Sequence, residues 1–122
     1  MIDEMGPLCC GKPHQAQRLT EVSLLIFMTQ GISHGYAMLE KLKQLNLGLE
    51  DLNTSTLYRT LRKMEANGHI RSEWESGGPG PKRRVYQITE QGTAYLKQWI
   101  DVLTVRRARI DSIIEAYNRL LS

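Results

Sequence analysis

The sequence lacks a long apolar run, dispersed cysteines and the common signatures of nucleotide-binding and zinc-dependent enzymes. Its longest uninterrupted apolar run covers only residues 24–28, whereas a membrane-spanning helix needs roughly 18 or more apolar residues. Residues 1–5 lack the positive region and the apolar stretch of a signal peptide. We therefore expect a cytoplasmic protein without membrane association.

Two common signatures of catalysis are missing. The chain contains no Gly-x-x-x-x-Gly-Lys-(Ser/Thr) loop, which would cradle phosphates, and no His-Glu-x-x-His pair, which would bind zinc. We expect no catalytic residues, no cofactor and no metal, and we interpret His34 and His69 as structural residues of turns.

Cysteine is present only as the adjacent pair Cys9 and Cys10. Neighbouring cysteines cannot join distant parts of a fold, which is typical of proteins from a reducing compartment. Thiolate and imidazole are good ligands for soft metals, so this pair and His14 leave open a redox-sensing or metal-sensing regulator. Because the spacing gives an incomplete site, we favour the alternative of an inert, flexible arm over residues 1–17.

Positive charge is concentrated in one part of the chain. The formal net charge of the 122 residues is only +3, with a pI near 9.0. Between residues 53 and 84 the basic side chains are Arg59, Arg62, Lys63, Arg71, Lys82, Arg83 and Arg84, and the acidic ones are Glu65, Glu73 and Glu75. Such a local excess suits a polyanion, because each neutralised phosphate releases counterions. A chain of this length holds one domain and an appendage.

Apolar periodicity predicts two helices after the arm. Residues 18–30 are apolar on most of the circumference of a helix that ends before Gly31. Such a helix needs cover on more than one side, from other elements or from a second subunit. Residues 36–45 form a shorter amphipathic helix, with Tyr36, Leu39 and Leu42 at helical spacing. A brief strand or turn is expected over residues 46–52.

A third helix is expected over residues 54–67, with an N-cap at Asn53 or Thr54 and a stop at Gly68. The apolar stripe of this helix, at i, i+4 and i+7, consists of Leu57, Leu61 and Met64. At about 100° per residue, the residues that fall on the opposite side are Ser55, Arg59, Arg62 and Lys63. One face is therefore expected to pack and the other to be cationic.

Two strand patterns follow, separated by the Gly-Gly-Pro-Gly-Pro segment at residues 77–81. In the first strand Ile70, Ser72 and Trp74 alternate with charged residues, and in the second Arg84, Tyr86 and Ile88 share one face. The segment between them suits neither a helix nor the interior of a sheet. The pattern predicts a hairpin with a long, mobile tip.

No proline interrupts residues 90–122, so a single helix capped by Thr89 is expected there. It is longer than the usual helix of about 8 to 20 residues in a globular domain. Its apolar residues at heptad spacing are Leu96, Trp99, Leu103, Ile110, Ile113, Tyr117 and Leu120, with Arg106 as the exception. We expect this seam to form a dimer interface.

The expected fold is α+β and mainly helical, a winged helix-turn-helix with a long C-terminal dimerisation helix. Its expected divisions are an arm (1–17), a DNA-binding domain (18–89) and the dimerisation helix (90–122). In such a fold the third helix enters the major groove of double-stranded DNA and the hairpin, or wing, reaches flanking phosphates. We therefore expect a DNA-binding regulator and not an enzyme.

Four segments of the chain resemble the PadR family of bacterial transcriptional regulators. They are Gly35-Tyr36, Thr56-Leu57-Tyr58-Arg59-Thr60-Leu61, Glu65-Ala66-Asn67-Gly68 and Arg83-Arg84-Val85-Tyr86-Gln87-Ile88-Thr89-Glu90-Gln91-Gly92. The resemblance covers residues 19–122 and implies a homodimeric repressor of a palindromic operator, released by a small effector or another cue. The single C-terminal helix resembles the short subfamily, in which that helix packs against the partner's N-terminal region.

Charge pattern and resemblance together select the candidate DNA-contacting residues. They are Tyr36, Ser55, Thr56, Tyr58, Arg59, Arg62, Lys63, Lys82, Arg83 and Arg84. The alternatives are a solvated face for the helix cations, capping and packing for Ser55, Thr56 and Tyr58, and protection against edge pairing for the wing cations. Tyr36 is selected by the resemblance alone, with a place in the core as its alternative.

Trp99 is a candidate for stacking on a planar aromatic effector, because it resembles the tryptophan of multidrug-binding relatives. The position that those relatives use falls near Leu103, about one turn later, so we favour ordinary interface packing for Trp99. The rival function is a winged-helix interaction module that binds a protein partner and not DNA.

Overall fold

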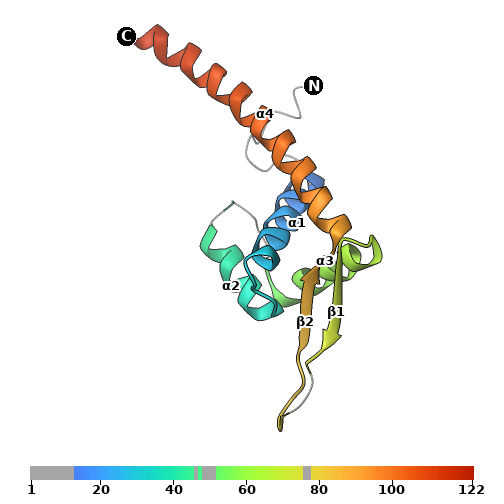
Figure 1. The fold of residues 1–122 in the computed structure, drawn as a ribbon. Helices are drawn as coiled ribbons and strands as arrows, with labels where there is room; N and C mark the ends of the chain where they lie inside the picture. The colour runs from blue at the N-terminus through green and yellow to red at the C-terminus, as the bar shows by residue number, and fades with distance from the viewer. Residues whose placement is uncertain (1–12, 46, 48–51, 76–77) are drawn as a thin grey trace.

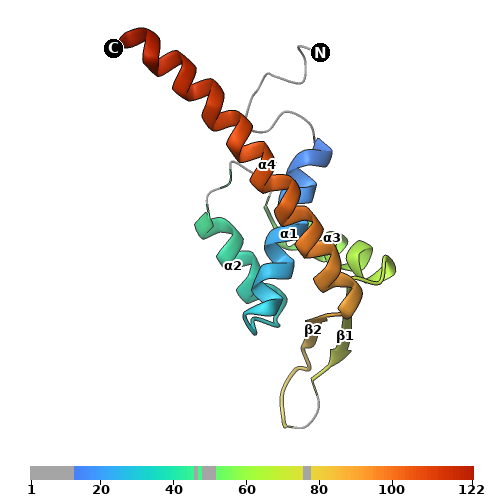
Figure 2. The same cartoon turned by 45° about the horizontal axis from the view of Figure 1, so that its top comes forward.

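The computed structural model describes residues 13–45, 47, 52–75 and 78–122. Its elements are α1 (Pro13–Thr29), α2 (Gly35–Leu45), α3 (Thr54–Ala66), β1 (Ile70–Trp74), β2 (Arg84–Ile88) and α4 (Glu90–Leu121). The first three helices and the hairpin form one body, from which α4 projects as a long rod while the hairpin extends on the opposite side (Figure 1). A second view shows the same arrangement (Figure 2). The predicted winged-helix fold with a long C-terminal helix is confirmed.

The first helix begins earlier than its apolar pattern indicates. It was expected from Arg18, with residues 13–17 in the arm, but α1 starts at Pro13. Proline is favoured at the first helical position, because its φ is already helical and an N–H there would have no partner within the helix. Residues 1–12 lie outside the described residues, so the sensor hypothesis for Cys9 and Cys10 stays a prediction.

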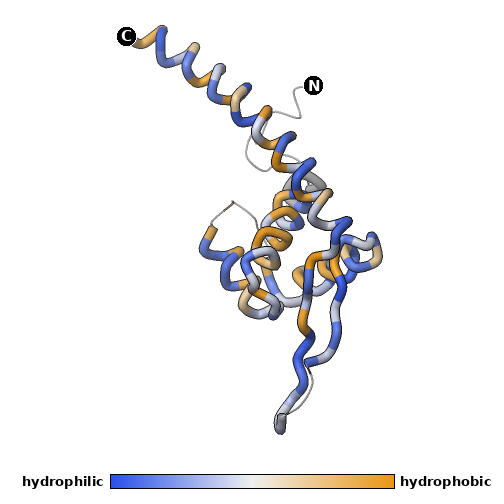
Figure 3. Tube along the Cα trace, in the orientation of Figure 1, coloured by the Kyte–Doolittle hydropathy of each residue, from blue (hydrophilic) through white to orange (hydrophobic). Residues whose placement is uncertain are grey.

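The core lies where α1 meets the other elements. Its buried members from α1 are Val22, Leu24, Leu25, Phe27 and Met28. Contacts with α2, α3, β2 and α4 cover this surface within the chain, so no second subunit is needed to bury it. Apolar residues accordingly gather where these elements meet (Figure 3). Each fully buried side chain of this size contributes about 1.5–3 kcal/mol to folding.

The third helix has the predicted cap and the predicted faces. The side-chain oxygen of Asn53 accepts a hydrogen bond from the backbone N–H of Thr56 at 2.9 Å. Leu57, Leu61 and Met64 are all buried, as expected. Thr60 is also buried and donates its hydroxyl proton to the carbonyl of Thr56 at 3.0 Å, so a polar residue joins the packed face without an unpaired group.

The predicted hairpin is confirmed as an antiparallel pair in which Ile70 faces Ile88 and Trp74 faces Arg84. Ile70 and Tyr86 are buried against the helices. The backbone N–H of Tyr86 donates to the carbonyl of Ser33 at 2.9 Å, which fastens β2 to the loop between α1 and α2. Most of the brief strand or turn expected over residues 46–52 lies outside the described residues.

The long helix starts at the root of the hairpin. The hydroxyl oxygen of Thr89 accepts from the backbone N–H of Gly92 at 3.0 Å, which confirms the predicted N-cap. Thr89 also donates to the carbonyl of Gly68 at 2.7 Å. A Cβ atom at Gly92 would overlap the carbonyl oxygen of His69, so the close crossing of α4 over the α3–β1 turn requires glycine there.

Candidate nucleic-acid interface

The outward face of α3 is cationic. Arg59, Arg62 and Lys63 are exposed, and none of them forms an ion pair or a side-chain hydrogen bond with another residue that the structure describes. Ser55 is also exposed, whereas Thr56 is half-buried beside the helix N-terminus. The predicted division of this helix into a packed face and a free positive face is therefore present.

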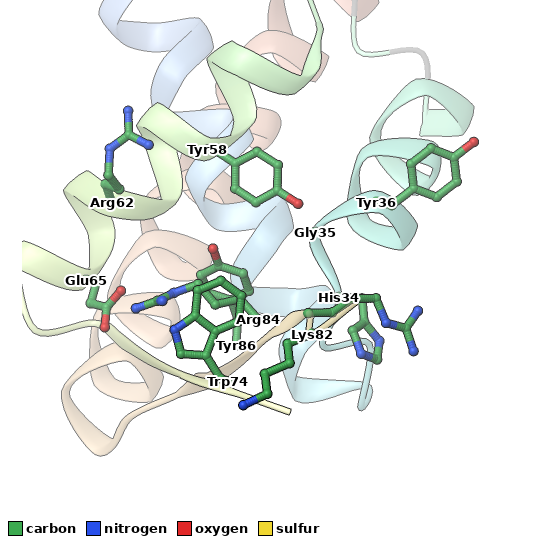
Figure 4. A pocket seen from close by; sticks show the side chains of 11 residues that line it. His34, Gly35, Tyr36, Tyr58, Arg62, Glu65, Trp74, Lys82, Arg84 and Tyr86 are labelled. Carbon is green, nitrogen blue, oxygen red and sulfur yellow. The ribbon is translucent and has the colours of Figure 1, made fainter. Parts of the chain in front are cut away.

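A groove of about 530 Å³ lies between α3, the start of α2 and the hairpin (Figure 4). The residues that line it are His34, Gly35, Tyr36, Tyr58, Arg62, Glu65, Trp74, Lys82, Arg83, Arg84 and Tyr86. Four of these side chains are Lys or Arg and one is a carboxylate. The groove thus brings Arg62 of the third helix and three cations of the wing to one place, where they attract a polyanion together.

Two tyrosines stand beside this groove. Tyr36 is 72% exposed at the start of α2, so its alternative place in the core is wrong. Tyr58 is half-buried, and its hydroxyl points toward Gly35 (Figure 4). Both tyrosines line the groove, but the hydroxyl of Tyr36 points away from the other labelled side chains (Figure 4).

The three wing cations differ in their surroundings. Lys82 is exposed and has no ion-pair partner within the described part of the chain. Arg83 is paired with Glu75, with 3.3 Å between Nε and a carboxylate oxygen. Arg84 donates from Nε to the hydroxyl of Ser72 at 3.1 Å, and its guanidinium lies 4.9 Å from the ring centroid of Trp74. Lys82 is the freest of the three, and Arg84 is held at the outer end of the β1–β2 ladder.

A network of half-buried and exposed side chains lies beside the groove. The Ser72 hydroxyl, which accepts from Arg84, donates to the Glu65 carboxylate at 2.9 Å and so joins the wing to α3. Burial raises the pKa of Tyr86 above its usual 10.0, and the neighbouring Tyr58 adds to that rise while Arg84 opposes it. The phenol of Tyr86 is therefore neutral near pH 7.

Several lining residues were not singled out by sequence patterns. His34 reaches the groove from the α1–α2 loop, and Glu65 was counted only as an acidic residue. Trp74 was noted only for its alternation with charged residues in β1, and it is 57% exposed at the groove wall whereas Ile70 of the same strand is buried. The alternation in the strand indicates which side of the hairpin Trp74 faces, but it does not indicate how far the side chain is buried.

The heptad seam of α4 divides into an inner and an outer part. Leu96 packs against the chain's own core, and Trp99 and Leu103 are half-buried. Farther out, the exposed residues are Ile110 at 56%, Ile113 at 70%, Tyr117 at 60% and Leu120 at 80%. Leu96 is thus occupied within the chain, whereas the outer residues have no apolar cover from it.

Trp99 has cations beside its indole ring. The guanidinium of Arg18 lies 5.5 Å from the ring centroid and that of Arg106 lies 5.8 Å from it. Tyr95 approaches the same indole edge-on at 6.4 Å. Arg106, the exception in the heptad series, therefore has a structural partner on its own helix.

Groups for metal binding are not gathered in the described residues. No three His, Cys, Asp or Glu side chains there lie close enough to hold a metal ion. Residues 31–35 match the Gly-x-Ser-x-Gly pattern of serine hydrolases, but they connect two helices, whereas that nucleophile sits between a strand and a helix. Among the described helices, none is both long and apolar enough to cross a membrane.

The sequence matches a family of transcriptional regulators. The model of the transcriptional regulator PadR-like family matches residues 24–98. This match contains α2, α3, the hairpin and the first turns of α4, and therefore every element that lines the groove. No curated protein matches the chain.

Solved structures agree with the family match. A conserved protein described as a potential transcriptional factor is 27% identical, with a TM-score of 0.75, over 87% of this chain and 93% of that chain. A PadR family transcriptional regulator from Eggerthella lenta is 26% identical, with a TM-score of 0.62, over 84% and 88%. A PadR-like transcriptional regulator from Bacillus cereus, at 20% identity and a TM-score of 0.69 over 83% and 96%, shares the fold.

Proposed function

The chain belongs to the PadR-like family of transcriptional regulators, and from this premise we propose that it is a cytoplasmic homodimeric repressor of a palindromic operator in double-stranded DNA. The observation that supports DNA binding most directly is the groove in which Arg62 of α3 meets Lys82, Arg83 and Arg84 of the wing. A helix fits the major groove of B-DNA, and a wing beside it reaches the adjacent backbone.

Each candidate residue has a role in this proposal. Ser55, Arg59 and Arg62 lie on the exposed side of α3 and contact base edges, since arginine pairs with guanine through two hydrogen bonds. The remaining residues position the protein on phosphates, and they are Tyr36, Thr56, Tyr58, Lys63, Lys82 and Arg83. Arg84 mainly supports the wing through Ser72 and Trp74.

The homodimer is supported by the outer part of α4. Its exposed large apolar residues beyond Arg109 are Ile110, Ile113, Ile114, Tyr117, Leu120 and Leu121. An exposed apolar stripe of this kind marks an interaction site, and a second copy of the chain would remove it from water. Two copies related by twofold symmetry read two half-sites of opposite orientation, so the operator is palindromic.

Release by a small effector completes the proposal. Trp99, half-buried where α4 leaves the body, is the residue proposed to stack on a planar ligand. Arg18 and Arg106 already lie beside its indole, so a ligand has to displace one of them. In a Trp74→Phe variant the tryptophan fluorescence comes from Trp99 alone. If this fluorescence stays constant across a panel of planar aromatic compounds while DNA binding is intact, Trp99 has only a packing role.

Fluorescence anisotropy with a labelled duplex from upstream of the chain's own gene tests the DNA-binding proposal. The Arg59→Ala plus Arg62→Ala variant is expected to bind about 100-fold more weakly at fixed salt, because each base contact contributes about 1–3 kcal/mol. Wild-type affinity is expected to fall steeply with salt. The matched control is Arg71→Ala plus Lys97→Ala, which removes the same charge from residues that do not line the groove. Arg71 donates to Gln87 on another surface of the hairpin.

Undiminished binding by the Arg59 and Arg62 variant would remove α3 as the recognition helix. An equal loss of DNA affinity in the control would show that the effect comes from net charge alone. A stoichiometric protein partner together with no DNA complex at low salt would favour the interaction module instead.

A further inference from the structure

Glu75 connects the wing to the α1–α2 loop. It directly follows β1, and its backbone N–H donates to the carbonyl of Arg83 at 2.8 Å, so the two residues face each other across the hairpin. One oxygen of its carboxylate lies 3.3 Å from Nε2 of His34, and the other accepts from Nε of Arg83, also at 3.3 Å. A single carboxylate thus contacts both a groove-lining histidine and a groove-lining arginine.

The fold does not depend on this carboxylate. The loop is already fastened to β2 by the backbone hydrogen bond from Tyr86 to Ser33, and the hairpin has its own ladder. The side chain of Glu75 is 42% exposed and that of Arg83 is 66% exposed. Ion pairs with this exposure contribute little to stability, so the reason for a carboxylate at this position lies elsewhere.

The charge of Glu75 acts on the wing. Arg83 lines the groove near Lys82, but its guanidinium is already partly neutralised by Glu75. A DNA phosphate that approaches Arg83 must replace the carboxylate as its partner. The phosphate also meets the negative charge that Glu75 retains, which opposes binding by simple repulsion.

We propose that Glu75 is a positioning residue that restrains DNA binding, because its carboxylate holds Arg83 and competes with a DNA phosphate for it. This inference rests on the proposed function, since it requires a DNA duplex in the groove. A phosphate contact carries no sequence information, so the restraint acts equally on the operator and on unrelated DNA. Glu75 therefore limits the sequence-independent part of the affinity and leaves the base contacts of α3 unchanged.

Glu75→Gln in the full chain tests the inference, because glutamine keeps the size of the side chain and removes its charge. We expect about threefold to fivefold tighter binding to the operator and to a scrambled duplex alike. The slope of log K against log salt is expected to become steeper by about 0.9, as for one additional phosphate contact. A purely structural role for Glu75 would not change this slope.

Two further variants make the test specific. Glu73→Gln removes the same charge two residues earlier in the hairpin, but Glu73 lies with Arg71 and Gln87 on a surface outside the groove. The DNA affinity of this variant is expected to change less than about twofold. Arg83→Ala is expected to weaken binding slightly in the wild-type background and to abolish the whole gain in the Glu75→Gln background. Such coupling is the signature of two residues that act through one contact.

The inference is overturned if Glu75→Gln binds DNA no more tightly than the wild type while melting at the same temperature. It is also overturned if the gain survives Arg83→Ala, or if Glu73→Gln gives the same gain. Failure of the wild type to bind any duplex is a different result, because it removes the proposed function itself. Tighter binding with a steeper slope that depends on Arg83 supports the inference.

Discussion

Gly35 and Tyr58 lie so close together that a Cβ atom at position 35 would stand 2.6 Å from the tyrosine hydroxyl oxygen and 2.9 Å from its Cζ. Gly35 is the first residue of α2 and is buried, whereas Tyr58 belongs to α3 and lines the groove. Because glycine has no side chain, the phenol of Tyr58 can occupy the space beside position 35. A packing requirement between two helices thereby fixes a candidate DNA contact.

Gly35→Ala is expected to push the Tyr58 ring out of its place and to weaken DNA binding. Overpacking of this kind costs about 1–3 kcal/mol, so the urea midpoint should fall as well. In Gly35→Ala plus Tyr58→Leu the obstructing ring is gone, and most of the lost stability should return while DNA affinity stays low. Equal destabilisation of the single and double variants would show that Tyr58 is not the obstacle.

Local sequence patterns were sufficient where the structure depends on near neighbours along the chain. The faces of α3 follow from the spacing of Leu57, Leu61 and Met64, and the caps follow from Asn53 and Thr89. The hairpin follows from two alternating segments around a Gly/Pro tip, whereas its register comes from the structure. In each case the determining contacts span a few residues or one turn, so periodicity and capping chemistry describe them.

Contacts between distant parts of the chain were beyond such patterns. Glu75 and His34 are separated by 41 positions, and no local feature of either residue indicates the other. The same holds for Gly35 and Tyr58, which meet only because α2 packs against α3. Exposure of Trp74 was also hidden, because alternation indicates the side of a strand that a residue faces and not how far the strand extends from the body.

Asn53→Ala is expected to lower the free energy of unfolding by about 1 kcal/mol, because the amide of Thr56 loses its capping acceptor. Urea denaturation followed by circular dichroism measures this change. Asn53→Asp keeps a capping oxygen and should stay near the wild-type value. Equal losses in both variants would mean that position 53 stabilises the chain by something other than the cap.

Tyr86 predicts a dependence of stability on alkaline pH. Burial raises its pKa above 10.0 in the folded chain, while the unfolded chain keeps the ordinary value, so the folded state holds the proton more tightly. The resulting contribution to stability is complete below pH 10 and is lost as the pH rises through the raised pKa. Tyr86→Phe has no proton to lose, and its urea midpoint should decline less steeply above pH 10 than that of the wild type.

The control for this prediction is Tyr117→Phe, which changes a tyrosine that is 60% exposed on α4. This control should follow the wild-type decline. Parallel declines of the wild type and Tyr86→Phe would show that burial of the Tyr86 phenol does not govern the alkaline loss of stability.

Ile113→Lys plus Leu120→Lys tests whether the outer part of α4 holds two copies of the chain together. These side chains are 70% and 80% exposed in the single chain, so the change should leave the melting of the monomer body intact. Two lysines per chain in an apolar interface leave charges that are costly to bury. We expect a monomer in analytical ultracentrifugation at concentrations where the wild type is a dimer.

The matched control is Ser112→Lys plus Asn118→Lys, which adds the same charge to α4 at heptad positions outside the apolar seam. It should remain dimeric. Loss of the dimer should also separate the two DNA-binding bodies, so that affinity for a full palindrome falls to that for one half-site while the half-site affinity itself persists. A seam variant that stays dimeric, or a wild type that is monomeric at micromolar concentration, would show that this stripe does not join two copies.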